Sequence, residues 1–467
     1  MLQYERVVQT VSSMIYQGLL KEGDRIPSLR SMSDQTGTSI NTVRQAYDRL
    51  EQHFLIESVP QSGYYVRSLG RELQALPARD PLKMNPLDVG MCRIFSMYQE
   101  RGELDAKSTL GIAALSPELY PTKELMRITG EIAREGNGQV FGYQIPPGYL
   151  PLREQLALRA KECGVDISPN DIVITNGCHE ALYLILSALC QKGDTVVLET
   201  PFYFHFLNML EKLELNVIEI PATEEGISLE TLDFILDRYP VAAMITASNF
   251  SNPLGFSHPR EKKKALLEIL EKRKIPLIED DVYGELHFNG KHRETYSALA
   301  EGEQEVYLCS SFSKSLGPGL RIGWVWPGKY REAVIDHKTI MNLGASSMEQ
   351  IMLTRYLKGG LFSKHLRKIR RVIKENSQVL ERLFREALPG GSRVTQPEGG
   401  MFLWVTLPNQ FDTMELYRKA QAKGILIAPG VLFSQSRDYS HSFRINTGYL
   451  PEDPEAVVQA IVDCLQG

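Results

Sequence analysis

The chain has 467 residues, of which 43% are hydrophobic and 23% charged, a composition typical of a globular protein long enough for two or three domains. The formal net charge of −5 excludes a polycation that coats nucleic acid by bulk attraction, so any DNA contact must be local. The six cysteines include no CxxC pair, so we expect neither a zinc site nor a disulfide framework. The first residues lack a signal-peptide pattern and no apolar run is long enough to span a bilayer, so we expect a cytoplasmic protein without a membrane partner.

Residues 1–68 are predicted to form short amphipathic helices followed by a hairpin. Apolar residues recur at every fourth position from Val7 to Ile15, which predicts a first helix. Ser28 is placed to cap a second helix that stops near Gly37, and Ser39 is placed to cap a third. The inward face of the third helix is expected to hold Val43, Ala46, Tyr47 and Leu50. Two helices joined by a short glycine-containing turn are typical of a helix-turn-helix, and the hairpin over 55–66 would be its wing.

Three sequence blocks in this region, over 23–30, 39–47 and 61–66, resemble the winged helix-turn-helix of the GntR family. The resemblance implies contacts with double-stranded DNA by Arg30, Ser39, Thr42 and Arg44, with Gly63 at the wing tip. Acidic and basic residues balance in this module, so tight binding would need a dimer and well-placed arginines. The helix pattern alone fits a three-helix interaction domain with solvated arginines equally well, and the three blocks in order favour DNA binding.

Residues 69–107 are predicted to be a linker, because prolines punctuate a polar stretch that lacks apolar periodicity, with a possible helix over 87–104. From about residue 108 onward, short β-branched runs alternate with helical patterns. The runs that we interpret as buried parallel strands cover 172–175, 195–199, 241–246 and 275–279. This alternation predicts that residues 108–467 form an α/β domain with a mainly parallel central sheet.

Reactive side chains follow several of these predicted strands. Lys314 lies on the loop after a short strand over 306–309, Arg321 follows seven residues later, and Asp280 ends an earlier strand. Ligands of parallel sheets bind at the carboxyl ends of the strands, so we expect these side chains to meet. Singly, each has an ordinary interpretation, such as a solvated lysine or a helix-capping aspartate. Together they supply a Schiff-base lysine, an anion for a pyridine nitrogen and a cation for a phosphate, which are the needs of pyridoxal 5′-phosphate (PLP).

The order of these residues resembles fold-type I aminotransferases of class I over roughly residues 108–467. The resemblance implies that Lys314 carries PLP and that Arg444 grips a ligand carboxylate. The other implied cofactor contacts are Asp280 at the ring nitrogen, Asn252 and Tyr283 at the ring oxygen, Ser311, Ser313, Arg321, Gly177 and Cys178 at the phosphate, Tyr203 stacked on the ring, and Tyr143 reaching the phosphate across a dimer. Cys178 stands where the family often has a serine or threonine, so we expect the phosphate to be bound more by backbone N–H groups at this point. His179 and His205 are expected near the cofactor, where either could tune ligand choice, although a packing or surface role is the commoner one for such residues.

A GntR-type module joined to such a domain resembles the MocR/GabR subfamily of transcription regulators. The resemblance implies a domain-swapped, head-to-tail homodimer that senses a small amine, an amino acid or PLP itself through aldimine chemistry at Lys314. The alternative is a catalytically active aminotransferase that carries a DNA-binding domain, and it stays open because every residue needed for transamination is present. A structural protein with a vestigial pocket would have lost Lys314 or Asp280, and both are present.

Overall fold

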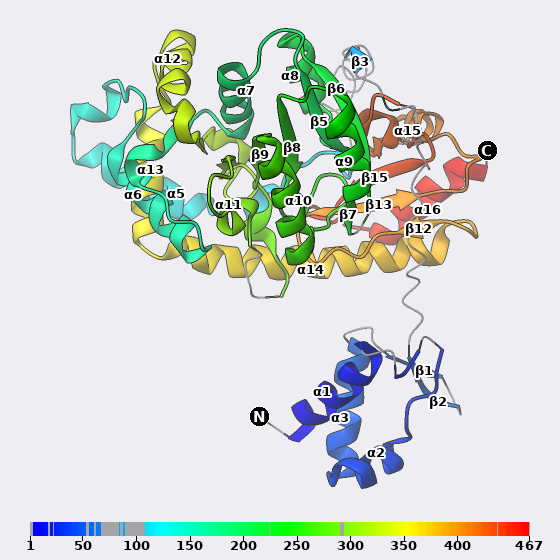
Figure 1. The fold of residues 1–467 in the computed structure, drawn as a ribbon. Coiled ribbons are helices and arrows are strands. Elements are labelled where there is room, and N and C mark those ends of the chain that lie inside the picture. Colours follow the sequence, from blue (N-terminus) through cyan, green and yellow to red (C-terminus); the bar gives the residue numbers. More distant parts are fainter. Residues whose placement is uncertain are drawn as a thin grey trace. The chain divides into compact units, whose positions relative to one another are not determined.

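The computed structural model describes residues 3–16, 19–21, 23–52, 56–59, 62–66, 84, 87–88, 108–223, 225–289, 294–436 and 438–466. The chain divides into two compact units, Met1–Ala75 and Leu76–Gly467, each described by itself below (Figure 1).

The smaller unit has the predicted helices and hairpin. Its elements are α1 (Gln3–Tyr16), α2 (Leu29–Thr36), α3 (Ile40–Gln52) and the antiparallel strands β1 (Ile56–Val59) and β2 (Gly63–Val66). Ser28 caps α2 by accepting a hydrogen bond from the Ser31 amide at 3.3 Å, and Gly37 ends it in the left-handed conformation. Ser39 Oγ accepts from the Thr42 amide at 3.2 Å and so caps α3. Both predicted caps are confirmed.

The core of this unit is formed by the apolar faces that the periodicity predicts. Val43, Ala46, Tyr47 and Leu50 of α3 are all fully buried, together with Val7 of α1 and others. The Tyr47 hydroxyl donates to the carbonyl of Pro27 at 2.7 Å, which satisfies the one polar group that this face carries inward. Since the apolar side of α3 is used for packing, its polar side remains for contacts outside the unit.

The larger unit is built on a large mixed sheet. Its strands are β3 (Leu87–Asp88), β4 (Val173–Thr175), β5 (Thr195–Thr200), β6 (Asn216–Thr223), β7 (Gly226–Ile227), β8 (Ala243–Ala247), β9 (Leu277–Asp280), β10 (Val306–Ser311) and β11 (Gly323–Trp326). The order across the sheet is β3-β6-β5-β8-β9-β10-β11-β4, and β7 pairs with β6. From β6 to β10 neighbouring strands are parallel, whereas β3 and β11 are antiparallel to their neighbours. The predicted mainly parallel α/β domain is confirmed.

Helices cover both faces of this sheet. On β5, Val196 and Leu198 pack against α7 (Cys178–Leu189) and α8 (His205–Lys212), while Val197 packs on the other side with α9 (Leu229–Arg238) and α10 (Arg260–Arg273). Alternate side chains of a strand point to opposite faces, so a strand buried on both sides reads as a continuous apolar run. This explains why the sequence pattern of these strands lacks polar alternation.

A second, smaller antiparallel sheet lies toward the C-terminus. Its order is β12 (Arg393–Val394), β13 (Phe402–Thr406), β15 (Ser442–Asn446) and β14 (Ala428–Pro429). The long helix α14 (Leu361–Ala387) runs along the larger unit toward this sheet (Figure 1). The remaining α-helices are α5 (Thr122–Arg134), α6 (Leu150–Glu162), α11 (Tyr296–Leu299), α12 (Arg331–Asn342), α13 (Ser347–Lys358), α15 (Thr413–Ala422) and α16 (Pro454–Gln466).

The prediction of a helix that begins at Leu87 is wrong. Leu87 and Asp88 form strand β3, which pairs antiparallel with Val217 and Asn216 of β6. The pairing supplies partners for the backbone groups of β6 on that side, which a helix at this point would leave unpaired. The rest of 87–104, and nearly all of the predicted linker, lies outside the described residues. Among the described helices, none combines the length and apolar character needed to cross a bilayer.

Candidate functional site

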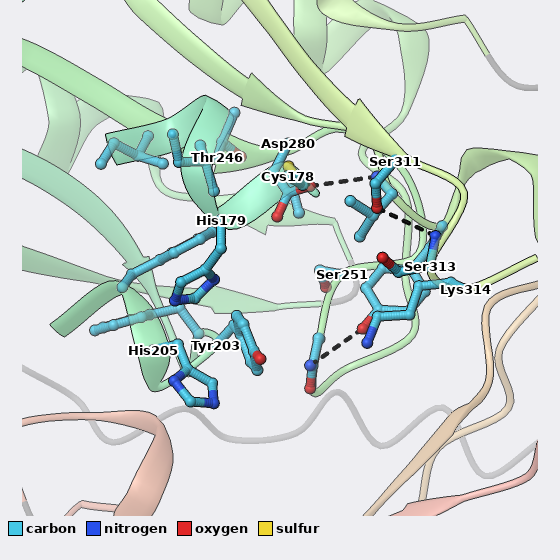
Figure 2. Close-up of a pocket in the computed structure, with 18 of the residues that line it drawn as sticks. Cys178, His179, Tyr203, His205, Thr246, Ser251, Asp280, Ser311, Ser313 and Lys314 are labelled. Atoms are coloured by element: carbon cyan, nitrogen blue, oxygen red, sulfur yellow. Dashed lines mark hydrogen bonds between the residues drawn. The ribbon is translucent and has the colours of Figure 1, made fainter. Parts of the chain in front are cut away.

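A cavity of about 350 Å³ opens at the carboxyl ends of β5, β8, β9 and β10 (Figure 2). The predicted site residues that line it are Cys178, Tyr203, Asn252, Asp280, Tyr283, Ser311, Ser313, Lys314 and Arg321. Each strand contributes through the residues at or just after its last position, because the register aligns Ala247 and Cys309 with Asp280. The structure therefore brings together residues that the sequence spreads over more than a hundred positions.

Lys314 is half-buried in the wall of the cavity. Its ammonium donates to the carbonyl of Ala113 at 2.8 Å and lies 5.9 Å from the centre of the Tyr283 ring. Burial, reinforced by the positive charge of Arg444, lowers the pKa of Lys314 to about 8. A lysine that loses its proton this readily is a competent nucleophile near neutral pH.

Asp280 is the buried carboxylate of the site. It accepts hydrogen bonds from the Cys178 thiol at 3.6 Å and from the Val282 amide at 3.2 Å. Burial raises the pKa of Asp280 to about 7, so its charge is costly in this environment. A cationic pyridine nitrogen beside it would offset that cost, and so the donor set fits the ring of PLP.

Arg321 and the start of α7 form an anion-binding corner. Gly177 has a φ of 87°, and a Cβ at this position would lie 2.8 Å from the Arg321 guanidinium, so only glycine fits. Arg321 Nη2 donates to the carbonyl of Asn176 at 2.6 Å. Because α7 begins at Cys178, its first amide groups have no intrahelical acceptor and can bind a phosphate. The Asn176 amide is already used, because it donates to Glu180 Oε2 at 2.6 Å.

Tyr203, His179 and His205 form an aromatic wall of the cavity (Figure 2). The ring centres of Tyr203 and His205 are 4.9 Å apart, and those of His179 and His205 are 5.0 Å apart. Burial lowers the pKa of His205 to about 3, so its imidazole is neutral in the working range of pH. Both histidines line the cavity, which confirms their expected place near the cofactor site.

Arg444 and Tyr143 lie outside this lining. Arg444 is fully buried on β15 and reaches the site through Asn252, whose Oδ1 accepts from Arg444 Nη1 at 2.7 Å. Asn252 Nδ2 in turn donates to the Tyr283 hydroxyl at 3.4 Å. Tyr143 is 81% exposed and does not line the cavity.

In the smaller unit, the predicted DNA contacts are spread over three elements: Thr42 and Arg44 lie on α3, which Ser39 caps, Arg30 lies on α2 and Gly63 begins β2. Arg30 and Arg44 are exposed, and Ser39 Oγ and Thr42 Oγ1 are hydrogen-bonded to each other at 2.8 Å. Gly63 has a φ of 123°, and a Cβ there would lie 3.2 Å from the Arg25 guanidinium. Arg25 therefore covers the first residue of the second wing strand, a contact that the sequence interpretation missed.

The sequence interpretation also missed the residues that support the site from behind. The Ala113 carbonyl, Glu180 and Lys338 carry no motif, and Glu180 reads as an ordinary surface residue in the first turn of a helix. The only signal for Glu180 in the sequence is that a charged residue follows shortly after Gly177 of the anion-binding corner. Within the described residues, no cluster of histidine, cysteine and acidic side chains is arranged to bind a metal ion.

Comparisons with known proteins agree with this geometry. The model of the aminotransferase class I and II family matches residues 117–461, and that of the gntR family of bacterial regulatory proteins matches residues 3–66. The uncharacterized HTH-type transcriptional regulators YjiR and YdcR of Escherichia coli (strain K12) are each 35% identical to this chain over 96% of its length, and the match covers 95% and 96% of their own lengths.

Solved structures match the larger unit. The α-aminoadipate aminotransferase LysN of Thermus thermophilus, complexed with N-(5′-phosphopyridoxyl)-L-leucine, superposes with a TM-score of 0.74 at 28% identity, covering 81% of this chain and 96% of that one. The kynurenine aminotransferase of Pyrococcus horikoshii gives a TM-score of 0.73 at 31% identity, covering 82% and 95%.

The chain belongs to the aminotransferase class I and II family, in the group of transcription regulators that carry a gntR helix-turn-helix at the N-terminus. Its cofactor is PLP, and its N-terminal module binds DNA. The fold of the larger unit is that of proteins that work as homodimers.

Proposed function

We propose that this protein is a transcription regulator that senses a small amine, an amino acid or PLP itself through Lys314. The observation that carries the proposal is the weakly basic Lys314 amine, which shares a cavity with Asp280 and Arg321 in a chain that also carries a DNA-binding module. An enzyme that only catalysed transamination would not need such a module. When bound, PLP supplies an aldehyde carbon that condenses reversibly with primary amines.

The residues of the cavity have distinct roles in this proposal. Lys314 would provide the amine that holds the cofactor, in the place where a ligand amine would compete with it. Asp280 holds a proton on the ring nitrogen, while Asn252 and Tyr283 orient the ring oxygen. Ser311, Ser313, Arg321, Gly177 and Cys178 bind the phosphate, and Tyr203 stacks on the ring. Arg444, whose guanidinium is fixed by Asn252, grips a ligand carboxylate.

The DNA-binding role requires two copies of the chain. We propose a domain-swapped homodimer with modules over 1–68, connecting segments over 69–107 and cofactor domains over 108–467, acting in the cytoplasm. Exposed apolar side chains support contact with a second copy of the chain, because Phe141, Tyr143, Ile145 and Ile340 are each at least 66% exposed. The 141–145 segment lies against Gly344, where an added Cβ would be 2.2 Å from the Gln144 carbonyl oxygen. Tyr143 would reach the phosphate of the partner from this position.

The experiment that tests the proposal is a titration of the PLP-loaded protein with a panel of amines and amino acids, following its visible absorbance and its affinity for promoter DNA together. A sensor is expected to form a stable adduct that changes DNA affinity, since only a ligand with different affinities for two states can shift them. Release of one keto acid per cofactor, with conversion of PLP to its amino form and no change in DNA affinity, would instead identify an aminotransferase. No spectral change with any amine would overturn the proposal.

A further inference from the structure

A buried ion pair lies behind the anion-binding corner. Lys338 of α12 is 1% exposed, and its ammonium donates to Glu180 Oε2 at 2.7 Å. The same ammonium donates to Asn342 Oδ1 at 3.1 Å. Lysine is rarely buried this completely unless it is paired, so the position of Lys338 calls for a reason beyond packing.

Glu180 connects this lysine to the corner. Its two carboxylate oxygens accept from the Asn176 backbone amide at 2.6 Å and from Asn176 Nδ2 at 3.1 Å. The carbonyl of Asn176 accepts from Arg321 at 2.6 Å. A continuous run of hydrogen bonds therefore links Lys338, through Glu180 and Asn176, to the cation of the phosphate site. Charge-assisted bonds of this length hold their partners firmly.

The charges explain why both members are needed. Glu180 stands in the first turn of α7, where an unpaired carboxylate would repel a dianionic phosphate. Burial works against ionisation of Glu180, but the donors from Lys338, Asn176 and Asn342 outweigh it and hold the pKa of Glu180 below its usual value. Because Lys338 neutralises Glu180, the Glu180 carboxylate can orient Asn176 without adding a net negative charge beside the phosphate.

We propose that Lys338 and Glu180 form a positioning pair that fixes the Asn176–Gly177 turn and Arg321 for the phosphate of the cofactor. The inference rests on the proposed use of the cavity for PLP, and it assigns roles to two residues that do not line the cavity. The predicted signature is an effect on the phosphate alone. The affinity for PLP depends on the pair, whereas the affinity for pyridoxal, which has the same ring and aldehyde but no phosphate, does not.

The test is a titration of the full-length apoprotein with PLP and with pyridoxal, by absorbance. In Lys338→Met, the uncompensated carboxylate is expected to weaken PLP binding by about tenfold or more and leave pyridoxal binding unchanged. The double variant Lys338→Met/Glu180→Gln removes both charges and should recover most of the lost PLP affinity. Lys263→Met is the matched control, because Lys263 is equally buried, at 1% exposure, but donates to Asn249 and the Glu294 carbonyl.

The control is expected to lower the melting temperature without changing the ratio of PLP to pyridoxal affinity. Equal losses of both ligands in Lys338→Met, or a double variant no better than the single one, would overturn the inference. If Lys338→Met does not fold, Glu180→Asp serves instead: it keeps both charges but shortens the reach to Asn176, and an unchanged affinity ratio there would also overturn it. A wild-type protein that bound neither ligand at Lys314 would refute the proposed function itself, which is a separate outcome.

Discussion

The two units of this protein build their functional surfaces in opposite ways. In the smaller unit, Arg30 and Arg44 are exposed on α2 and α3, helices whose other sides pack into the core. In the larger unit, Asp280 is buried and Lys314 half-buried, and each takes its environment from strands and loops distant in the sequence. Variants in the first unit should therefore act singly, whereas variants in the second should act through their neighbours.

The largest expected effect is that of Lys314→Ala, which removes the amine that holds the cofactor. The protein should lose the visible absorbance of the lysine-linked cofactor completely. Lys364→Ala, on the exposed surface of α14, is the control and should keep the full spectrum. An unchanged spectrum in Lys314→Ala would contradict the assignment of the site.

Arg444→Lys is expected to have the next largest effect. Lysine keeps the charge but cannot make the paired, planar contacts of the guanidinium with Asn252 and a carboxylate. Loss of a buried hydrogen bond to a charged group should weaken the response to amino acids by about 30-fold or more. Amines without a carboxylate should respond nearly as before, and an equal loss for both classes would remove Arg444 from the carboxylate site.

These contrasts also explain what the sequence could predict. The caps of α2 and α3 and the buried face of α3 depend on residues within one or two helical turns, and local pattern predicted them correctly. The gathering of Lys314, Asp280 and Arg321 was predictable from the order of the strands alone, because parallel strands end at one edge of a sheet.

Contacts between distant positions were beyond such reasoning. The bond from Arg444 to Asn252 spans 192 positions, and that from Lys338 to Glu180 spans 158. The helix expected from Leu87 was wrong for the same reason, since its partner Val217 decides that Leu87 is a strand residue. Local periodicity fixes which side of a helix is polar, but it does not say which distant backbone will pair with a short segment.

A smaller effect is expected from Arg44→Ala, which tests whether the DNA surface acts independently of the cavity. Loss of one exposed arginine from the polar face of α3 should weaken promoter binding by about tenfold. The cofactor spectrum and PLP affinity should stay unchanged. Arg49→Ala is the matched control, because Arg49 is also exposed on α3 but lies in its last turn. Equal losses in the two variants would indicate a general loss of charge instead of a specific contact.

The smallest effect concerns pH and sharpens the view that the buried site acts through its neighbours. A free lysine has a pKa near 10.4, whereas burial and the charge of Arg444 lower the pKa of Lys314 to about 8. Only the neutral amine attacks the cofactor, so the rate at which apoprotein takes up PLP should rise with pH and level off above a midpoint near 8. Arg444→Gln removes a positive neighbour, so it should raise the pKa of Lys314 and move the midpoint to higher pH. A midpoint near 10 in the wild-type protein would show that Lys314 is solvated and that the cavity does not set its chemistry. A midpoint near 8 that Arg444→Gln leaves in place would show that burial alone sets the pKa, and that Arg444 acts on the ligand and not on the lysine.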